Sequence, residues 1–321
     1  MPELPEVETI RIGLAHLLPG LVIAEVDFDW PKSFPNVPGD VAQFLIGAKI
    51  VRVTRRAKVL LIELSSGYSL IIHLKMTGQL VFIGSTVKKR IRDERLGIGK
   101  ALSPIPQFQP HDSEERFGAG HPNASLIGQL PDKSTRVELT FTDNSKLFFN
   151  DQRKFGWMRL LLTTEVMNLD FFRKVGPEPL AADFSWQTMR ERLLRRKNTT
   201  IKAAVLDQTV IAGIGNIYAD ESLWGAKIHP ASLVRNLSVQ QFRKLHQELL
   251  FVLKLSIEKG GSTDRNYVNA EGKKGSYIHF ARVFRREGEA CPRCGTIIQK
   301  TRVAGRGTHL CPHCQRQPRA L

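Results

Sequence analysis

Four cysteines near the carboxyl end constrain the fold of this 321-residue chain more than any other feature of its sequence. They form two C-x-x-C pairs separated by sixteen residues, Cys291 with Cys294 and Cys311 with Cys314. This spacing is typical of a zinc ribbon, in which two turns each present two thiolates to one tetrahedral ion. Two disulfides are the alternative, but neighbouring C-x-x-C thiols in an intracellular chain disfavour them. We predict one structural Zn²⁺ with four thiolate ligands and no position for a reactive water.

The balance of charges indicates the class of partner. Lysine and arginine total 47 against 31 acidic residues, which gives a formal net charge of +16. Such a surplus favours a polyanion, because the phosphates that a protein neutralises release their counterions. We therefore predict nucleic acid as the partner, with a generally basic surface as the alternative.

Hydropathy argues against a membrane partner. Hydrophobic residues make up 42% of the chain, but no apolar run approaches the roughly 18 residues that a membrane span needs. The first residues are acids and prolines, where a signal peptide has a basic segment followed by an apolar one. We expect a protein of the cell interior.

The amino-terminal half alternates between helical and strand patterns. Val7, Ile10 and Leu14 recur at helical spacing, which predicts an amphipathic helix near the start. "KVLLIEL" and "YSLIIHLKM" around "SSG", and "RVELTF" and "KLFFND" around "TDNS", predict two β-hairpins of a layered antiparallel sheet. Residues 84–131 combine glycine, proline and mixed charge without periodicity, so we expect an inserted mobile loop there.

The carboxyl-terminal half is predicted to be helical. "GPEPLAADF" marks a linker, and "SWQTMRERLLRR" and "NIYADESLWGA" predict two helices after it. Ser238 and Gln241 form a capping box for a longer helix that ends at Gly260 and Gly261. A polar loop then leads to the cysteines.

The first residues, "MPELPEVETI", raise a chemical question. Removal of Met1 would expose the secondary amine of Pro2, and a terminal amine has a pKa of about 7.7–8.0, so part of it is neutral at pH 7. The positive end of a following helix disfavours the ammonium further. Such an amine can attack a sugar C1′ and form an iminium, with Glu3 transferring a proton. The alternative is a proline and an acid that simply start a helix.

Five motifs in order resemble the formamidopyrimidine-DNA glycosylase family, bacterial enzymes that excise oxidised purines such as 8-oxoguanine. They are "PELPEVET", "RRAK" at 55–58, "DQRKFG" at 151–156, "GIGNIYADE" at 213–221 and the paired C-x-x-C. The resemblance covers nearly the whole chain outside 84–131. It implies an α+β fold of two domains, an antiparallel β-sandwich flanked by helices and a helix–two-turns–helix domain with a zinc ribbon.

With this resemblance, the expected domain bounds follow the chain. They are a catalytic β-sandwich domain at 1–175, a linker at 176–185, a helix–two-turns–helix DNA-binding domain at 186–260, a lesion-recognition loop and connection at 261–284, and a zinc finger at 285–321.

The resemblance also implies catalytic roles. Pro2 resembles the Schiff-base nucleophile, Glu3 the acid for base departure, and Glu6 a supporting carboxylate. Lys58 resembles the lysine that assists β-elimination; without the family context it is one more basic residue facing phosphate. Arg306 in "AGRGTHLC" resembles an arginine linked to δ-elimination and phosphate contact, and an ordinary loop arginine is the alternative.

A further set resembles the residues that fill the space left by a flipped base. Met76 on "HLKMTG", with Arg153 and Phe155 on "DQRKFG", matches this void-filling triad, and soft, flat and cationic side chains suit an opened base step. Core packing is the alternative for Met76 and Phe155. We interpret the nearby His73 as a satisfied sheet histidine.

Other matches concern phosphate. "GIGN" is not a dinucleotide fingerprint, because Tyr218 stands where a third glycine is required, so no nucleotide cofactor is implied. As a turn between helices it would present backbone N–H groups and Asn216 to a phosphate. Lys197 and Lys202 resemble further phosphate contacts, with solvated surface charge as the alternative.

The loop "GGSTDRNYVNAEGKKG" resembles the lid over the extruded base, with Ser262, Arg265 and Tyr267 near the lesion pocket. Three features depart from the family. The 84–131 insertion has no counterpart in typical members, Ser134 in "KSTRV" replaces a DNA-contacting histidine, and Thr77 stands where some members carry an acid.

We therefore predict a bifunctional DNA glycosylase and AP lyase of base excision repair. It excises 8-oxoguanine and formamidopyrimidines through a Schiff base at Pro2 and cuts the strand by β,δ-elimination. We expect a monomer that binds double-stranded DNA with oxidised purines or abasic sites, in the bacterial cytoplasm at the nucleoid.

Two alternatives stay open at this point. A sister glycosylase for oxidised pyrimidines has a "PEGPE"-type terminus in place of "PELPEVET". A zinc-ribbon DNA-binding protein without catalysis would account for the charge and the zinc but not for Pro2, Glu3 and Lys58 together.

Overall fold

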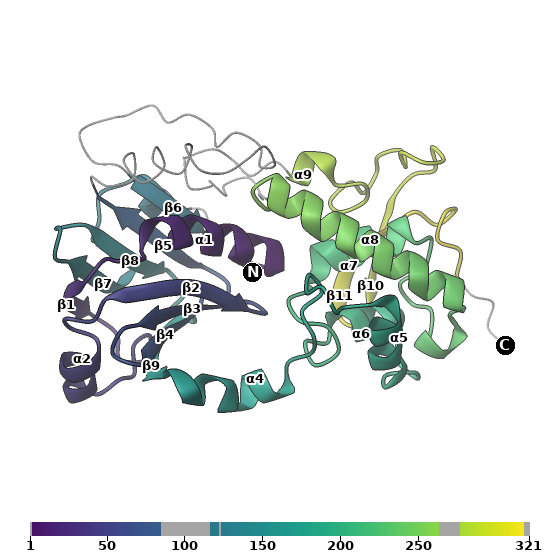
Figure 1. The fold of residues 1–321 in the computed structure, drawn as a ribbon. Helices are drawn as coiled ribbons and strands as arrows, with labels where there is room; N and C mark the ends of the chain where they lie inside the picture. The colour runs from purple at the N-terminus through teal and green to yellow at the C-terminus, as the bar shows by residue number, and fades with distance from the viewer. Residues whose placement is uncertain (1, 85–115, 122, 263–276, 318–321) are drawn as a thin grey trace, which may run out of the picture. The chain divides into compact units, whose positions relative to one another are not determined.

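The computed structural model describes residues 2–84, 116–121, 123–262 and 277–317 (Figure 1). The chain divides into two compact units, residues 1–173 with 258–275 and residues 174–257 with 276–321. The first unit holds the sheets, and the second holds most of the helices and the cysteines.

The first unit opens with the predicted helix. α1 spans Leu4–Leu17 and buries Val7, Ile10 and Leu14 on one face. Glu3 is its N-cap residue, and Glu6 lies in its first turn, where a carboxylate is favoured by the helix dipole. The short helix α2 follows at Pro38–Phe44.

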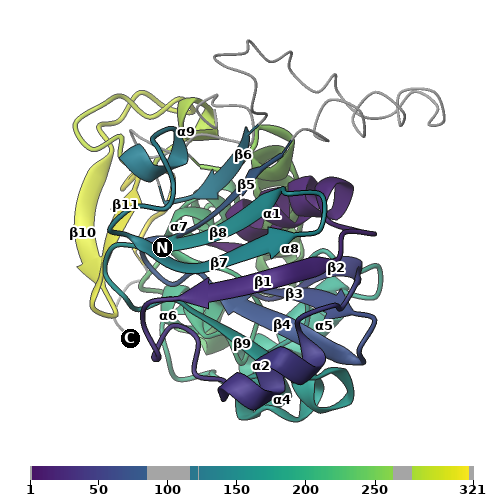
Figure 2. The same cartoon turned by 90° about the vertical axis from the view of Figure 1, so that its left-hand side faces the viewer.

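Two antiparallel sheets form the body of the first unit (Figure 2). The five-stranded sheet has the order β1 (Ile23–Phe28), β7 (Thr135–Phe141), β8 (Lys146–Asp151), β5 (Gly78–Ile83) and β6 (Arg116–Gly120). The four-stranded sheet has the order β2 (Ile50–Arg56), β3 (Val59–Leu64), β4 (Tyr68–His73) and β9 (Trp157–Leu162). Both predicted hairpins are confirmed, β3 with β4 and β7 with β8.

The strand β6 corrects one expectation. Residues 84–131 were predicted to form a loop without regular structure, but 116–120 pair with β5 at the edge of the sheet. The following residues are tied down as well, because the Gln79 amide donates to the Asn123 side chain at 2.8 Å. The 3-10 helix η2 at Ala124–Leu126 then packs on the outer face of the same sheet through Leu126. The "KKRIRDER" segment lies outside the described residues.

One hydrophobic core joins α1 to both sheets. Its buried side chains include Ile10 from α1, Ile62 from β3, Phe82 from β5 and Phe149 from β8. A smaller cluster covers the other face of the four-stranded sheet, where η3 (Thr163–Asn168) and α4 (Asp170–Lys174) pack. The four-stranded sheet is therefore packed on both faces. Several candidate site residues lie at the ends of the strands of the two sheets.

The second unit has its own core of helices. The helices are α5 (Trp186–Leu194), α6 (Ile201–Leu206), α7 (Asn216–Gly225), α8 (Val239–Glu258) and α9 (Tyr277–Phe280), with the 3-10 turn η4 at Val234–Asn236. The predicted capping box of α8 is present: Gln241 N donates to Ser238 Oγ at 3.2 Å, and Ser238 N donates to Gln241 Oε1 at 2.9 Å.

A two-stranded hairpin, β10 (Gln299–Val303) and β11 (Arg306–Leu310), lies between the two cysteine pairs. Antiparallel sheets, a helical part and this carboxyl-terminal module confirm the predicted fold class. Within the described ranges, no helix combines the length and the apolar character that crossing a membrane requires.

Candidate active site and DNA-contact residues

The amino end of α1 is held by a buried carboxylate. Glu6 Oε2 accepts a hydrogen bond from Glu3 N at 2.8 Å, and both acidic residues are buried. Because Glu3 N belongs to the peptide that follows Pro2, this bond fixes the peptide plane next to the proposed nucleophile. Pro2 itself is half-buried, and Met1 lies outside the described residues.

The second oxygen of Glu6 binds Ser262, one of the predicted pocket residues. Glu6 Oε1 accepts from both Ser262 N and Ser262 Oγ, each at 2.8 Å. The preceding Gly261 has φ +93°, which favours glycine, and a Cβ there would lie 3.4 Å from Glu6. The structure thus brings Ser262 to the helix that carries Glu3. Arg265 and Tyr267, the other predicted pocket residues, lie outside the described residues.

Lys58 lies in the tight turn between β2 and β3 and is buried. The turn is set by Ala57, which has φ 53°, and Arg55 NH1 donates to the Ala57 carbonyl at 2.7 Å. Arg55 Nε also donates to Glu8 Oε2 of α1 at 2.9 Å. This ion pair links the strand that leads into the Lys58 turn to the helix that follows Pro2.

His73, at the end of β4, behaves as a neutral sheet histidine. Burial, together with the positive charges of Lys75 and Lys58, lowers the pKa of His73 to about 3. Its Nδ1 accepts from Lys75 N at 3.0 Å, so the ring proton resides on Nε2. The interpretation as a satisfied histidine agrees with this geometry, and the Lys58 ammonium lies within electrostatic range of it.

Two loops of the first unit present the predicted void-filling side chains. Met76 is 40% exposed in the β4–β5 turn, and Phe155 is 53% exposed in the β8–β9 loop. The Arg153 guanidinium lies 4.8 Å from the centre of the Phe155 ring. Large apolar side chains this exposed contribute little to the core, so the alternative of core packing for Met76 and Phe155 is wrong.

In the second unit, Asn216 and the hairpin residue Arg306 are brought together. Asn216 is the first residue of α7, and its Nδ2 donates to the Gly307 carbonyl at 3.0 Å. Arg306, the neighbour of Gly307, is exposed at the start of β11. The first turn of α7, whose N–H groups lie outside the helix's own hydrogen-bond ladder, therefore contacts the residue that follows Arg306 in the hairpin.

Lys202 corrects a prediction. It was expected to contact phosphate, but its side chain is 0% exposed and its Nζ lies 2.6 Å from Asp220 Oδ1. The ammonium also donates to the Gly307 carbonyl at 2.9 Å and to Thr308 Oγ1 at 2.7 Å. Lys202 therefore supports the hairpin from inside. Lys197, by contrast, is exposed.

Two acidic residues of "GIGNIYADE" were missed as structural anchors. Asp220 Oδ2 accepts from His309 N at 2.9 Å, so it binds the hairpin as well as Lys202. Glu221 Oε1 accepts the backbone N–H groups of 282–284. Both acids are fully buried. The sequence did contain a signal for this role, because Asp220 and Glu221 stand inside an otherwise apolar helix. Acidic side chains are buried only when they have partners, so such a pair indicates partners elsewhere in the chain.

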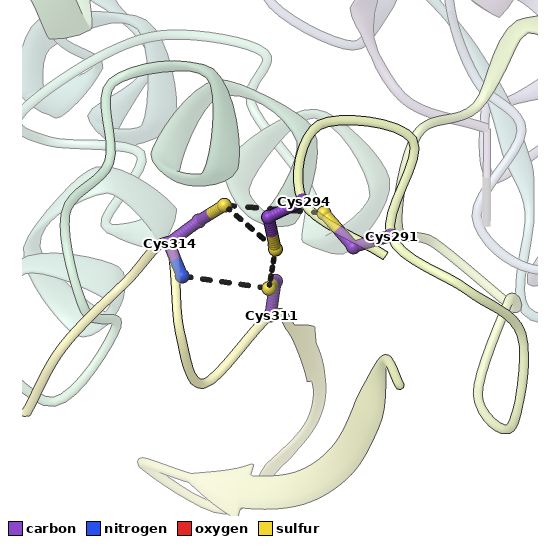
Figure 3. A group of neighbouring side chains, drawn as sticks. All are labelled: Cys291, Cys294, Cys311 and Cys314. Carbon is purple, nitrogen blue, oxygen red and sulfur yellow. Dashed lines mark hydrogen bonds between the residues drawn. The ribbon is translucent and has the colours of Figure 1, made fainter. Parts of the chain in front are cut away.

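The four cysteine sulfurs form one cluster (Figure 3). All lie within 4.8 Å of one another, with contacts of 3.4 Å, 3.5 Å and 3.9 Å among them. A tetrahedral ion with zinc–sulfur bonds of about 2.3 Å places its sulfurs about 3.8 Å apart, so the cluster fits zinc.

The thiol groups of this cluster differ in acidity. Hydrogen bonds from Thr296 lower the pKa of Cys294 to about 5. Burial, with hydrogen bonds to the other cysteines, raises the pKa of Cys314 to about 12. A divalent ion that binds thiolates would allow all four to lose their protons.

Ser134, which the resemblance led us to expect in place of a DNA-contacting histidine, is buried. Its hydroxyl donates to Asp132 Oδ1 at 2.7 Å and lies 2.9 Å from Ser125 Oγ. Burial alone would raise the pKa of Asp132, but hydrogen bonds from Ser125, Ser134 and Thr135 lower it overall. The position therefore stabilises the segment between η2 and β7.

Three family models match the chain in sequence order. They describe the formamidopyrimidine-DNA glycosylase N-terminal domain (residues 1–158), the formamidopyrimidine-DNA glycosylase H2TH domain (residues 175–267) and a zinc finger found in FPG and IleRS (residues 288–317). The last match and the sulfur cluster confirm the predicted structural zinc site.

Relatives of known identity align over almost the whole chain. The formamidopyrimidine-DNA glycosylase of Geobacillus kaustophilus is 39% identical over 98% of this chain and all of its own length. That of Chloroflexus aggregans is 38% identical over 98% of both chains.

Solved structures of the same family are similar to this chain over almost its whole length. The Lactococcus lactis Fpg in complex with DNA containing an abasic site superposes with a TM-score of 0.77, at 33% identity over 98% of this chain and all of that one. A complex of MutM with DNA containing carbocyclic 8-oxo-G gives 0.76, with the same identity and coverage.

Proposed function

Because the chain belongs to the formamidopyrimidine-DNA glycosylase family, we propose that Pro2 is its nucleophile and that Glu3, Lys58 and Arg306 assist the reaction. The protein is a DNA glycosylase of base excision repair that also has AP lyase activity. It acts on duplex DNA that contains oxidised purines or abasic sites. The rival of a zinc-ribbon binder without catalysis is thereby set aside. The names of the relatives favour oxidised purines as substrates, and a comparison of excision from 8-oxoguanine and thymine-glycol duplexes would test this preference.

Base removal begins at the sugar. The neutral Pro2 nitrogen attacks C1′, the bond between C1′ and the base breaks, and Glu3 delivers the proton that the departing base needs. The sugar ring then opens: the proton that the Pro2 nitrogen still carries passes to O4′, the C1′–O4′ bond breaks, and the Pro2 nitrogen and C1′ form an iminium.

Strand cutting follows from the positive charge of the iminium. A base removes the C2′ proton, and the electron pair expels the 3′ phosphate, which is the β-elimination that Lys58 assists. Loss of the C4′ proton then expels the 5′ phosphate. Arg306 stabilises the charge of that leaving phosphate, because a guanidinium binds phosphate oxygens in a bidentate manner. Water finally hydrolyses the Schiff base and frees Pro2.

The observation that carries this proposal is the buried bond from Glu3 N to Glu6 Oε2 at 2.8 Å. It places Pro2 at the positive end of α1, where the neutral amine is favoured over the ammonium. It also orients Glu3, which is buried next to Pro2 in the chain and which we propose as the general acid. Glu6 acts as the supporting carboxylate of both residues.

The remaining residues hold the DNA. We assign Met76, Arg153 and Phe155 to the void left by the flipped base, and Asn216 and Lys197 to phosphates. Ser262, Arg265 and Tyr267 are proposed to line the lesion pocket. We further propose that the protein acts as a monomer at the bacterial nucleoid, with the domain bounds expected from the sequence.

Covalent trapping tests the nucleophile. With borohydride present, incubation with an abasic-site duplex should convert the iminium into a stable amine, and peptide mapping should locate the DNA on Pro2. Intact mass gives the fraction of protein that lacks Met1. Pro2→Gly should lose most base excision while its salt-dependent DNA binding stays unchanged. Normal excision by that variant would refute the assignment.

Glu3→Gln separates the two steps. This variant should excise 8-oxoguanine about 10²–10⁴ times more slowly, which is the usual contribution of a general acid. Cleavage of a preformed abasic site should suffer less, because no base has to leave. Equal losses in the two reactions would show that Glu3 has another role.

A further inference from the structure

The two loops that carry the void-filling side chains meet at a buried carboxylate. Met76 precedes β5 and Arg153 follows β8, and these strands are hydrogen-bonded neighbours. Asp151, the last residue of β8, is the register partner of Gly78, the first residue of β5. The two loops therefore leave the sheet side by side.

Asp151 binds both loops through its side chain. Its Oδ1 accepts from the Thr77 hydroxyl and from Arg153 N, the latter at 3.2 Å, and its Oδ2 accepts from Gly156 N at 2.5 Å. The carboxylate is fully buried. A buried carboxylate is stable only when donors replace its hydration, and these three come from the two loops.

Thr77 closes this arrangement. Its hydroxyl donates to Asp151 and accepts from Arg153 N at 3.2 Å, so it contacts both the carboxylate and the backbone of the opposite loop. The far end of that loop is equally close-packed. A Cβ on Gly156 would lie 2.8 Å from Phe149 Cζ and 3.1 Å from Asp151 Oδ2. Neither loop can shift without breaking one of these contacts.

We propose that Thr77 and Asp151 are positioning residues for lesion extrusion. Their contacts fix Met76 relative to Arg153 and Phe155, so that the three side chains enter the base stack as one unit. The inference rests on the proposed function of these three residues. Its physical basis is preorganisation, because loops that move independently would have to be ordered during each extrusion event.

A matched pair of variants tests the role of the hydroxyl. Thr77→Val keeps the branched shape and removes the hydroxyl, whereas Thr77→Ser keeps the hydroxyl. In single-turnover assays, Thr77→Val should excise 8-oxoguanine opposite cytosine about threefold to tenfold more slowly. This is the effect of losing the hydrogen bond to Asp151, because Arg153 N keeps its own bond to Asp151 Oδ1. Thr77→Ser should restore the rate. Cleavage of a preformed abasic site in the same duplex should change little.

The same variants in a triple-alanine background give a sharper readout. If Thr77 acts through the void-filling residues, Thr77→Val should slow excision no further when Met76→Ala, Arg153→Ala and Phe155→Ala are already present. A 2-aminopurine next to the lesion should report slower unstacking in Thr77→Val by stopped-flow fluorescence. Thr77→Ala provides a second variant if Thr77→Val does not fold.

Three outcomes would overturn the inference. They are equal losses in excision and in abasic-site cleavage, an additive loss in the triple-alanine background, and unchanged excision in folded Thr77→Val. Failure of the wild-type enzyme to excise 8-oxoguanine would instead refute the proposed function, so the two failures are distinguishable.

Discussion

Two lysines of similar sequence context, Lys197 and Lys202, have opposite surroundings at the scale of single residues. Lys197 is exposed, whereas Lys202 is buried against Asp220 and the Gly307 carbonyl. An exposed lysine that binds phosphate contributes to the salt dependence of affinity, while a buried one contributes to stability.

Substitution should separate these roles. Lys202→Met leaves the Asp220 carboxylate buried without its cation and should lower the free energy of unfolding by about 3–5 kcal/mol, as measured by urea denaturation. Lys197→Ala should leave unfolding unchanged and reduce the slope of log K against log[salt] by about 1. A stable Lys202→Met variant with a reduced salt slope would show that Lys202 binds phosphate after all.

His73 should make the stability of the first unit depend on pH. Its folded pKa of about 3 lies below the ordinary value of 6.5, so the unfolded chain binds a proton that the folded chain excludes as the pH falls below 6.5. Stability is therefore full above pH 6.5 and declines towards pH 3. At pH 5 the decline should be about 2 kcal/mol.

The control is His73→Asn, which retains an acceptor for Lys75 N but has no proton to gain. Chemical denaturation of both proteins at pH 7 and pH 5 measures the difference. An identical pH dependence would show that His73 does not titrate as its burial requires.

Single residues are predictable from the sequence where spacing encodes chemistry. The four cysteines are brought together by two short turns, so the spacing from Cys291 to Cys314 is enough to assign them to one site. Lys202 cannot be assigned in this way, because its burial depends on Asp220, eighteen residues further along, and on Gly307, more than a hundred residues away. Whether a charged side chain is exposed or buried depends on the tertiary structure, which local sequence spacing does not reveal.

At the scale of elements, the contact between α1 and β6 joins the helix that follows Pro2 to the unexpected edge strand. A Cβ built on Gly13 would overlap the Cε2 and Cζ atoms of the Phe117 ring. The aromatic ring therefore occupies the space above the glycine, and α1 can lie against β6 only because residue 13 has no side chain.

Gly13→Ala should destabilise the protein by about 1–3 kcal/mol, the usual cost of overpacking a core. Urea denaturation followed by circular dichroism measures this change. Combining Gly13→Ala with Phe117→Leu should recover part of the loss, since the ring is removed. Equal stability of Gly13→Ala and wild type would show that β6 does not pack on α1.

The predictability of the elements follows from how local their signals are. The β3–β4 and β7–β8 hairpins combine β-branched or aromatic runs with short polar turns, so the sequence indicates both strands and pairing. The strand β6 has the sequence "RFGAG", whose two glycines are unfavourable in a strand. The strand therefore depends on its hydrogen bonds to β5, because its own residues have little preference for the strand conformation.

At the scale of the whole molecule, the zinc site organises a module that carries Arg306. Gly307, the next residue, accepts from both Asn216 and Lys202. The hairpin itself has few buried apolar side chains, so we expect its order to depend on the metal as well as on the anchors Lys202 and Asp220. Structural zinc contributes on the order of 10 kcal/mol to the folding of such modules.

Cys311→Ser, or removal of zinc by a chelator, should therefore unfold the hairpin and weaken DNA binding while the first unit stays folded. Zinc release should increase as the pH falls, because protons compete with the metal for the thiolates. A chromogenic chelator, used alongside a DNA-binding assay, measures both effects. A variant that keeps its zinc and its affinity would show that this module is misinterpreted.

The bonds from Ser262 to Glu6 also have a consequence for engineering. Chimeras that exchange residues 263–276 between relatives would test the proposed role of this segment in substrate preference. Both the backbone N–H and the hydroxyl of Ser262 donate hydrogen bonds to Glu6 in α1. The junction of a chimera should therefore come after Ser262. A junction at Gly260 or Gly261 would replace Ser262 by the relative's residue, and any residue other than serine there would lose the hydroxyl bond to Glu6.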